Sequence, residues 1–187
     1  MGARRTCAAL AAAVLSAWAS AAKADPQTSI GLTIGGVVRD EQGAGASGAF
    51  HLGARGDVLL FRSRNSDMAV GPYVDAATAS FHDADLGGGL GWLVPMTEDF
   101  PLLLSAGGFA RDGDGRSWRP GLEGTLLVGP RSYNFHSWYG LAGGLFVQTR
   151  WLPQSPSTVD VVIGAQIDVE ILALPFVFAW QSLTHAS

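Results

Sequence analysis

The fold class is decided by a stretch near the end of the chain, residues 163–171, which reads IGAQIDVEI. Apolar side chains occupy its odd positions, and glycine, glutamine or acidic side chains occupy its even positions. Because successive side chains of a β-strand point to opposite faces, this two-residue period predicts a strand with one apolar and one polar face. About eight stretches of this kind follow the first two dozen residues, so the chain is predicted to be all-β.

Eight strands are predicted, and the connections between them are short. The strands are expected at residues 29–39, 46–61, 68–81, 86–94, 102–111, 118–128, 138–150 and 159–171. Residues typical of turns fill the connections at 40–43, 64–67, 82–85, 112–115 and 153–156. Sequential strands joined in this way form an antiparallel meander, and eight of them can close into a barrel that side chains fill. We therefore predict an eight-stranded antiparallel up-and-down β-barrel over residues 25–171, without a wide pore.

Residues 1–24 have the three parts of a secretory signal peptide. Arginines at positions 4 and 5 form a positive start, residues 8–19 an apolar centre, and residues 22–24 a small-x-small cleavage site. The apolar run is too short for a membrane-spanning helix, which needs about 20 residues. We therefore expect the mature chain to begin at Asp25.

After cleavage the chain is acidic and contains no lysine. The whole chain has 12 basic and 16 acidic residues, and three of the basic ones precede Asp25, which leaves a net charge of −7. Without a basic stripe, the sequence excludes nucleic acid as a partner. Cys7, the only cysteine, leaves with the signal peptide. No disulfide, cysteine metal site or cofactor is therefore expected.

The two faces of the predicted strands favour a membrane barrel. One face carries glycine, alanine and serine with isolated charges, whereas a surface in water would be dense in lysine, glutamate, threonine and asparagine. The other face is free of charge in every strand, as lipid requires. It includes Ile30, Leu32, Ile34, Phe50, Leu52, Val74, Leu90, Leu122, Leu126, Leu141, Leu145 and Ile167. The alternative is a soluble periplasmic barrel of the lipocalin kind that binds an apolar ligand.

Aromatic side chains gather near the predicted strand ends. They are Phe81, Trp92, Phe100, Trp118, Phe135, Trp138, Tyr139 and Trp151. Membrane barrels carry such side chains as girdles at the two membrane interfaces. In a soluble barrel, aromatics near turns would cap the core instead. Because eight of them share this placement, we interpret the set as an aromatic girdle.

In this pattern the chain resembles the small eight-stranded outer-membrane β-barrel proteins, the class that includes the OmpA transmembrane domain and OmpX. The resemblance covers residues 25–171 and lies in pattern, with no diagnostic motif. It implies an outer-membrane location, contact with outer-membrane lipid and recognition by the outer-membrane assembly machinery. We expect a monomer.

The C-terminal segment departs from that class. Its members usually finish on a strand with an aromatic last residue, whereas this chain ends QSLTHAS at residues 181–187. Residues 172–180 also alternate in the opposite parity to residues 163–171. Residues 172–187 are therefore either an extension of the last strand after a bulge near Pro175 or an interfacial tail.

No catalytic residues or metal ligands are predicted. A lipid A-modifying barrel enzyme would need serine and histidine on one surface, but the adjacent His136 and Ser137 point to opposite faces of a strand. The sequence DGDG at residues 112–115 lacks the distal glutamate of a calcium loop. We therefore expect a structural or envelope-stabilising role, with lipid A modification as an alternative.

Charged residues on the polar face are expected to form a network in the lumen. The turn between the second and third strands places Arg55 opposite Asp75. A directly opposed ion pair would hold both strands in register. Glu123, Asp168 and Glu170 are expected to point inward at comparable depth. The alternative is that trapped water solvates each of these side chains.

Five arginines are expected at the outer rim of the barrel if both chain termini are periplasmic. They are Arg39, Arg111, Arg116, Arg119 and Arg150. Arginine binds phosphate with two parallel hydrogen bonds, so these residues are predicted to contact the phosphates of lipopolysaccharide. The alternative is local pairing with the acidic residues of the same turns, Asp40, Glu41, Asp112 and Asp114.

Overall fold

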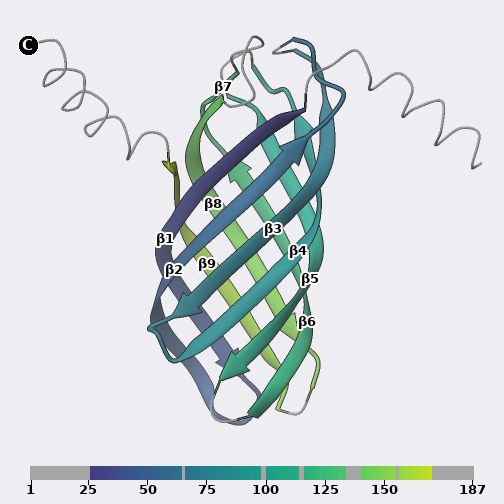
Figure 1. The fold of residues 1–187 in the computed structure, drawn as a ribbon. Helices are drawn as coiled ribbons and strands as arrows, with labels where there is room; N and C mark the ends of the chain where they lie inside the picture. The colour runs from purple at the N-terminus through teal and green to yellow at the C-terminus, as the bar shows by residue number, and fades with distance from the viewer. Residues whose placement is uncertain are drawn as a thin grey trace, which may run out of the picture.

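A closed antiparallel β-barrel of eight strands makes up most of the described structure (Figure 1). The computed structural model describes residues 26–64, 66–97, 100–113, 116–133, 140–154 and 156–169. The barrel strands are β1 (Gln27–Glu41), β2 (Gly45–Leu59), β3 (Ala69–Ala79), β4 (Asp83–Val94), β5 (Leu102–Gly113), β6 (Arg116–Val128), β8 (Gly140–Leu152) and β9 (Thr158–Asp168). The predicted signal peptide, residues 1–24, and the predicted C-terminal segment, residues 172–187, lie outside the described residues.

The ring closes because β1 pairs with both β2 and β9. Each consecutive pair of strands from β1 to β6 is antiparallel, and β8 links β6 to β9. The short strand β7 (Arg131–Tyr133) is a continuation of β6, since both pair with β8 in the same register. Pro130 interrupts β6 because it has no N–H to donate, but its carbonyl accepts a hydrogen bond from the Gly143 amide at 3.1 Å.

The prediction of eight strands is confirmed, and several of the predicted boundaries differ from those observed. The third hairpin turn lies at residues 80–82 instead of 82–85, and β4 begins at Asp83. The Asp83 carboxylate accepts a hydrogen bond from the Ala79 amide at 2.7 Å, which fixes the tight turn. Strand β9 ends at Asp168, before Val169, whereas the alternation predicted a strand to residue 171.

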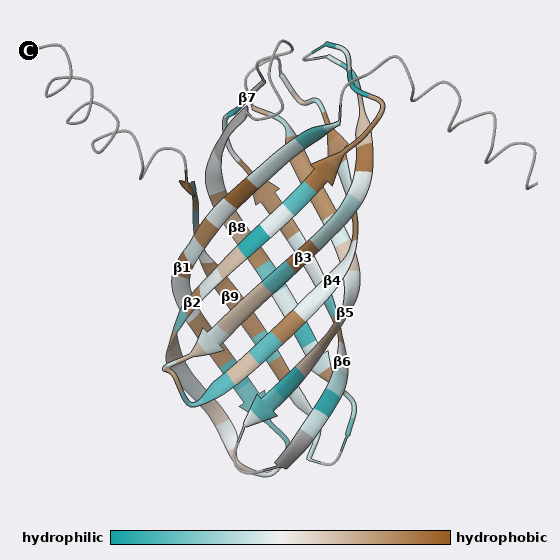
Figure 2. Ribbon diagram, viewed as in Figure 1, coloured by the Kyte–Doolittle hydropathy of each residue, from teal (hydrophilic) through white to brown (hydrophobic). Residues whose placement is uncertain are grey.

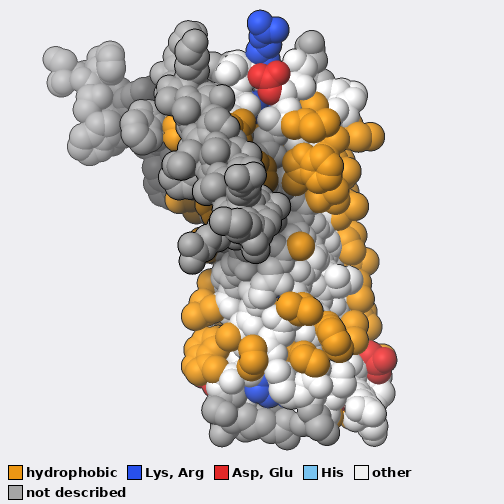
Figure 3. Space-filling model, turned by 90° about the vertical axis from the view of Figure 1, so that its right-hand side faces the viewer, with side chains coloured by type: hydrophobic (Ala, Val, Ile, Leu, Met, Phe, Trp, Pro, Cys, Tyr) orange, Lys and Arg blue, Asp and Glu red, His pale blue; other side chains and the backbone are white. Residues whose placement is uncertain are grey.

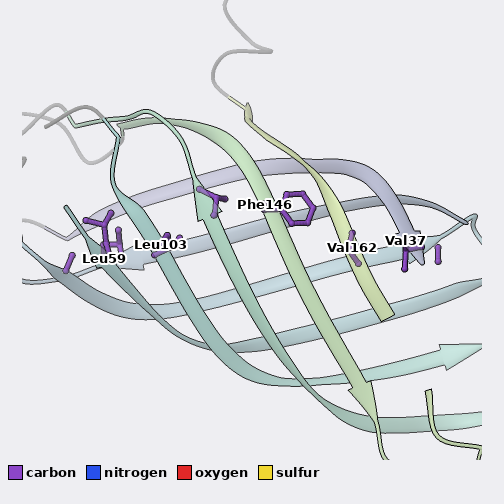
Figure 4. Packing of buried hydrophobic residues seen from close by; sticks show 9 residues of the cluster. Val37, Leu59, Leu103, Phe146 and Val162 are labelled. Atoms are coloured by element: carbon purple, nitrogen blue, oxygen red, sulfur yellow. The ribbon is translucent and has the colours of Figure 1, made fainter. Parts of the chain in front are cut away.

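Side chains alternate between the lumen and the outer surface along the strands wherever their burial is described, and hydrophilic and hydrophobic residues follow one another along the ribbons in Figure 2. Buried apolar side chains lie toward both ends of the lumen (Figure 4). Leu59 and Leu103 lie toward one end, Val37 and Val162 toward the other, and Phe146 lies between them. Buried polar and charged side chains, among them Arg55, Glu123 and Gln148, share the lumen with these apolar groups.

The outer surface is apolar on every barrel strand. Its exposed large side chains include Ile30, Leu32, Ile34, Val38, Phe50, Val70, Val74, Leu86, Leu90, Trp92, Leu122, Leu126, Leu145, Val147, Ile163 and Ile167. On the face shown in Figure 3, apolar side chains lie along the barrel wall and charged ones lie near its ends. Among the outward side chains described in the strands, the charged ones are Asp40 and Asp112, each the last residue but one of its strand.

The turn between β3 and β4 holds a bulky residue in the left-handed backbone region. Ser80 has φ 48° and Phe81 has φ 62°, a conformation that costs a non-glycine residue about 1–3 kcal/mol. The Phe81 side chain is 73% exposed, so no packing within the described chain offsets this strain.

We expect Phe81→Gly to be more stable than Phe81→Ala by about 1 kcal/mol, because both variants lose the ring and only glycine adopts positive φ without strain. The measurement is the free energy of unfolding by denaturant in detergent micelles. Equal stability of the two variants would show that the turn carries no backbone strain.

Candidate functional site in the barrel lumen

Arg111, on β5, lies at the centre of a buried ion network. Its Nε donates to Oδ1 of Asp85 on β4 at 2.6 Å, and its Nη2 donates to Oδ2 of Asp160 on β9 at 2.6 Å. Asp83, also on β4, lies 3.8 Å from the Arg111 Nε. The side chains of Arg111, Asp85 and Asp160 are each 2% exposed. One guanidinium therefore joins three strands across the lumen.

Arg150, on β8, extends the network toward the middle of the barrel. Its Nη1 donates to Oδ2 of Asp85 at 2.8 Å, and its Nε donates to Oε2 of Glu123 on β6 at 3.2 Å. Oδ2 of Asp75 on β3 lies 3.5 Å from its Nη2. The guanidinium groups of Arg150 and Arg111 each lie 5.5 Å from the centre of the Phe109 ring, close enough for cation–π attraction.

Arg39, on β1, completes the network at the end away from the N-terminal start of β1. Its Nη2 donates to Oδ2 of Asp83 at 2.7 Å, and its Nε donates to Oδ1 of Asp160 at 2.9 Å. We call these eight residues the lumen network: Arg39, Asp75, Asp83, Asp85, Arg111, Glu123, Arg150 and Asp160. They come from seven of the eight barrel strands, all except β2.

Neutral donors help to satisfy the carboxylates of the lumen network. The hydroxyl of Tyr73 donates to Oε1 of Glu123 at 2.9 Å, and Nε2 of Gln148 donates to Oδ2 of Asp75 at 3.1 Å. These donors matter because the network has five carboxylates and three guanidinium groups. A buried carboxylate without hydrogen bonds would be strongly destabilising.

A second group of charges lies nearer the barrel end that holds the start of β1. Arg131 on β7 donates to both carboxylate oxygens of Asp57 on β2, at 2.5 and 2.6 Å, and both side chains are buried. Arg55, also on β2, donates from Nη2 to the Ser105 hydroxyl at 2.8 Å, and its guanidinium lies 4.1 Å from the centre of the Tyr73 ring. Strand β2 therefore also contributes charge to the lumen.

The sequence placed the predicted lumen residues on the correct face. Arg55, Glu123 and Asp168 are buried, at 4%, 5% and 1% exposure, and the Asp75 side chain is 7% exposed. Arg55 and Asp75 are cross-strand partners, as predicted. Their side chains turn apart, however: Arg55 bonds Ser105, while Asp75 accepts from Gln148 and Arg150. Glu170 lies outside the described residues.

The prediction of a phosphate-binding arginine rim was wrong for three of its members. Arg111 and Arg150 are buried in the lumen and Arg39 is partly buried, and all three bond carboxylates. The physical reason is parity: these arginines share the inward face of their strands, and β5 and β8 continue for two residues beyond Arg111 and Arg150.

Local pairing of these arginines with the acidic residues of their turns was also wrong. Their partners Asp83, Asp85 and Asp160 come from other strands. Of the remaining predicted rim arginines, Arg119 is half-buried opposite Arg111, and Arg116 lies in β6 with its side chain outside the described part of the chain.

The predicted aromatic girdle is exposed wherever the structure describes it. Trp92 and Phe100 lie near the end that holds the start of β1, and Phe81, Trp118 and Trp151 lie near the opposite end. These five side chains are 47–73% exposed. Phe135, Trp138 and Tyr139 lie outside the described residues.

Sequence reasoning missed most members of the lumen network. It did not assign an inward role to the network members Arg39, Asp83, Asp85, Arg111, Arg150 and Asp160, nor to the buried pair Asp57 and Arg131. The residue numbers already indicated the inward face of these side chains. In the strands that contain or resemble that of Arg55, odd residues point inward, and this includes Asp57, Asp83, Asp85 and Arg111. In the last two strands even residues point inward, as Asp168 does, and this includes Arg150 and Asp160. Extending the parity rule to the strand ends would have placed them inside.

Glycine residues make room for the carboxylates in the lumen. A Cβ atom on Gly87 would overlap Oδ1 of Asp75 and Oε1 of Glu123, and a Cβ atom on Gly107 would lie 2.7 Å from the Tyr73 hydroxyl. Gly87 is the cross-strand partner of Asp75, and Gly107 is that of Glu123. The missing side chains thus let the Tyr73, Asp75 and Glu123 side chains lie across the lumen.

Within the described chain, no group of three or more histidine, cysteine or acidic side chains could hold a metal ion. The described residues also contain no helix long and apolar enough to cross a membrane. The lumen network can hold strands together, since each of its charged groups lies against an oppositely charged group on another strand.

The fold and the site define a class: an eight-stranded up-and-down barrel with charges inside and apolar side chains outside, the inverse of a soluble barrel that binds apolar ligands. No protein-family model matches the chain, and no curated protein matches its sequence. The class assignment therefore rests on the strand pairings and on the placement of the side chains.

Two proteins of known structure are similar to this chain, a designed transmembrane β-barrel and the bacterial protein Ail. A de novo designed transmembrane β-barrel matches at 16% identity with a TM-score of 0.38, over 74% of this chain and 94% of that one. Ail, the attachment invasion locus protein of Yersinia pestis, matches at 10% identity with a TM-score of 0.42 in its complex with the heparin analogue sucrose octasulfate. A second Ail structure matches at 13% identity with a TM-score of 0.34, and both Ail matches cover 78% of this chain and 99% of Ail.

We expect Arg150→Met to lower the free energy of unfolding by about 3–5 kcal/mol, because it leaves three buried carboxylates without their shared cation. Arg64→Met is the control: Arg64 is exposed in the connection between β2 and β3, so its loss should change stability by about 0.5 kcal/mol or less. Denaturant unfolding in detergent micelles measures both. Similar small losses for the two variants would mean that the lumen network contributes little.

We expect Gly87→Ala to destabilise the barrel by about 1–3 kcal/mol, because the added methyl group displaces Asp75 and Glu123. Gly36→Ala serves as the matched control, since a Cβ atom on Gly36 would have no neighbour within 4 Å. The readout is again the unfolding midpoint in detergent. If the two alanine variants unfold at the same denaturant concentration, the space over Gly87 is not needed by the carboxylates.

Proposed function

We propose that the protein is an integral outer-membrane β-barrel whose lumen is filled by side chains and whose role is structural or envelope-stabilising. The observation that carries this proposal is the outer surface. Large apolar side chains are exposed on seven of the eight barrel strands, all except β5, for example Ile30 at 61%, Leu90 at 64% and Ile163 at 63%. A soluble monomer rarely exposes a continuous apolar patch larger than a few hundred Å².

Lipid accounts for this surface better than water does. A barrel satisfies all backbone hydrogen bonds between its strands, so it can cross a bilayer without a free sheet edge. Exposed aromatic side chains near both barrel ends, Trp92 at one and Trp151 at the other, are typical of membrane interfaces. The predicted signal peptide supports export, and a barrel of this class would meet the outer membrane and its assembly machinery.

The filled lumen supports a structural role over transport or ligand storage. At its middle level the lumen has a cavity of about 10 Å³, which is close to the minimum needed for one water molecule. A lipocalin-like barrel would need a large apolar cavity for its ligand. The connections between strands at the end away from the start of β1 are short, at residues 42–44, 80–82, 114–115 and 153–157, so they offer little surface to a large partner.

Catalysis has no support in the described structure. His51 is 3% exposed, lies 3.2 Å from the Thr33 hydroxyl and packs edge-on against Phe146. It therefore lies inside the barrel and away from any substrate at the rim. His136 and Ser137, the adjacent pair considered for lipid A modification, lie outside the described residues.

The first test of this proposal is membrane fractionation. We expect the mature protein to stay with the membrane pellet in carbonate or high salt and to be released by detergent, because its contact with the bilayer is apolar. Release into the aqueous phase without detergent would contradict the proposal.

The second test is the depth dependence of a charged substitution. We expect Ile163→Arg to destabilise the barrel in lipid vesicles by about 2–4 kcal/mol, because it places a cation against the lipid chains. Met68→Arg is the control: Met68 is similarly exposed, at 57%, but precedes β3 at a barrel end, where the cost falls to about 0–1 kcal/mol. Two equally small effects would indicate that water surrounds the barrel wall.

A further inference from the structure

A small cavity lies in the lumen beside Arg55 and Asp75, with both polar and apolar side chains in its lining. Its volume is about 10 Å³, and its lining includes Thr33, Arg55, Asp75, Thr125, Gln148 and Gln166. These side chains come from β1, β2, β3, β6, β8 and β9. The cavity is therefore enclosed by the barrel wall at the level where the predicted Arg55–Asp75 ion pair would have formed.

Four of the lining residues carry polar atoms without a hydrogen-bond partner. These atoms are Nε and Nη1 of Arg55, Oδ1 of Asp75, Oγ1 of Thr125 and Oε1 of Gln166. Each side chain is more than nine-tenths buried: Arg55, Thr125 and Gln166 are 4%, 7% and 3% exposed, and the Asp75 side chain is 7% exposed. Buried polar groups in folded proteins are nearly always hydrogen-bonded, so this concentration around one cavity points to a ligand.

The chemistry of these atoms selects the ligand. The Arg55 guanidinium can only donate, which disfavours a cation, and the Asp75 carboxylate disfavours an anion. Asp75 and Gln166 offer acceptors, and the Thr125 hydroxyl can both donate and accept. The ligand must therefore be neutral, able to donate and accept at once, and no larger than the cavity.

We propose that this cavity is a binding site for a single structural water molecule, which accepts a hydrogen bond from Arg55 and donates to Asp75 and Gln166. Such a water would satisfy groups that no side chain reaches. It would also connect Arg55, the charge contributed by β2, to Asp75 of the lumen network. The hydrogen-bonded lumen would then include all eight strands.

The alternative to a bound water is a direct ion pair between Arg55 and Asp75. Arg55 and Asp75 are cross-strand partners, so a rotation of the Arg55 side chain away from Ser105 would form a direct ion pair and fill the cavity. The two arrangements differ in the partner of Arg55, which is a water molecule in one and the Asp75 carboxylate in the other. This proposal does not depend on the membrane location, because the cavity lies inside the barrel.

The test is a crystal structure of the detergent-purified protein at a resolution that shows ordered water. We expect one solvent peak within hydrogen-bond distance of Arg55, Asp75 and Gln166, with Arg55 still bonded to Ser105. A direct bond between Arg55 and Asp75, or a cavity without density, would overturn the proposal. A peak with the coordination of a metal ion or a halide would overturn it as well.

A pair of variants checks the same site in solution. Gln166→Leu removes one acceptor, and we expect it to abolish the water-to-amide cross-relaxation seen by NMR for the amides that border the cavity. Gln27→Leu is the matched control, since Gln27 is also a buried glutamine, at 5% exposure, but does not line the cavity. Retention of the signal in Gln166→Leu, or its equal loss in both variants, would contradict a water held at this site.

Discussion

The neutralisation of charge inside the lumen is the constraint on which the rest of the structure depends. The described barrel wall carries charged outward side chains only near strand ends, at Asp40 and Asp112. The other charges of the strands must therefore be satisfied by one another. Arg39, Arg111 and Arg150 do this by bonding five carboxylates on four other strands. The result is a barrel held by ionic and hydrogen-bonded contacts inside its lumen, which also contains buried apolar side chains.

This constraint also explains why the strand register is strict. A shift of one residue in any strand would move its whole inward set to the outer surface. For β4 such a shift would expose Asp83 and Asp85 on the outer surface and direct Leu86 and Leu90 inward. The same logic accounts for the glycine residues opposite Asp75 and Glu123, because a narrow eight-stranded lumen has room for long charged side chains only where their neighbours are small. The strand register, the positions of the glycine residues and the pairing of the charges therefore depend on one another.

The sequence predicted the fold well because the information is local. Alternation of apolar and polar residues sets the face of each side chain, and turn residues set the strand order. The same parity correctly placed Arg55, Glu123 and Asp168 in the lumen. The pairing itself could not be read in this way, because Arg39 bonds Asp160, 121 residues away, and Arg150 bonds Asp85, 65 residues away. The prediction of an arginine rim was wrong for this reason. It used the position of each arginine near a strand end and not the face of the strand that its residue number indicates, and the partners across the lumen are distant in the sequence.

The barrel is expected to face lipid with an uncharged wall and to keep its charges inside. Spin labels at Ile34, Leu90 and Ile163, with a reference label at Asp40, test this expectation most directly in lipid vesicles. The account predicts that oxygen, which dissolves in the bilayer, relaxes the three wall labels strongly, and that a water-soluble nickel chelate does not. The Asp40 label should show the reverse order. Equal access of the nickel chelate to the wall labels and to the Asp40 label would contradict the account.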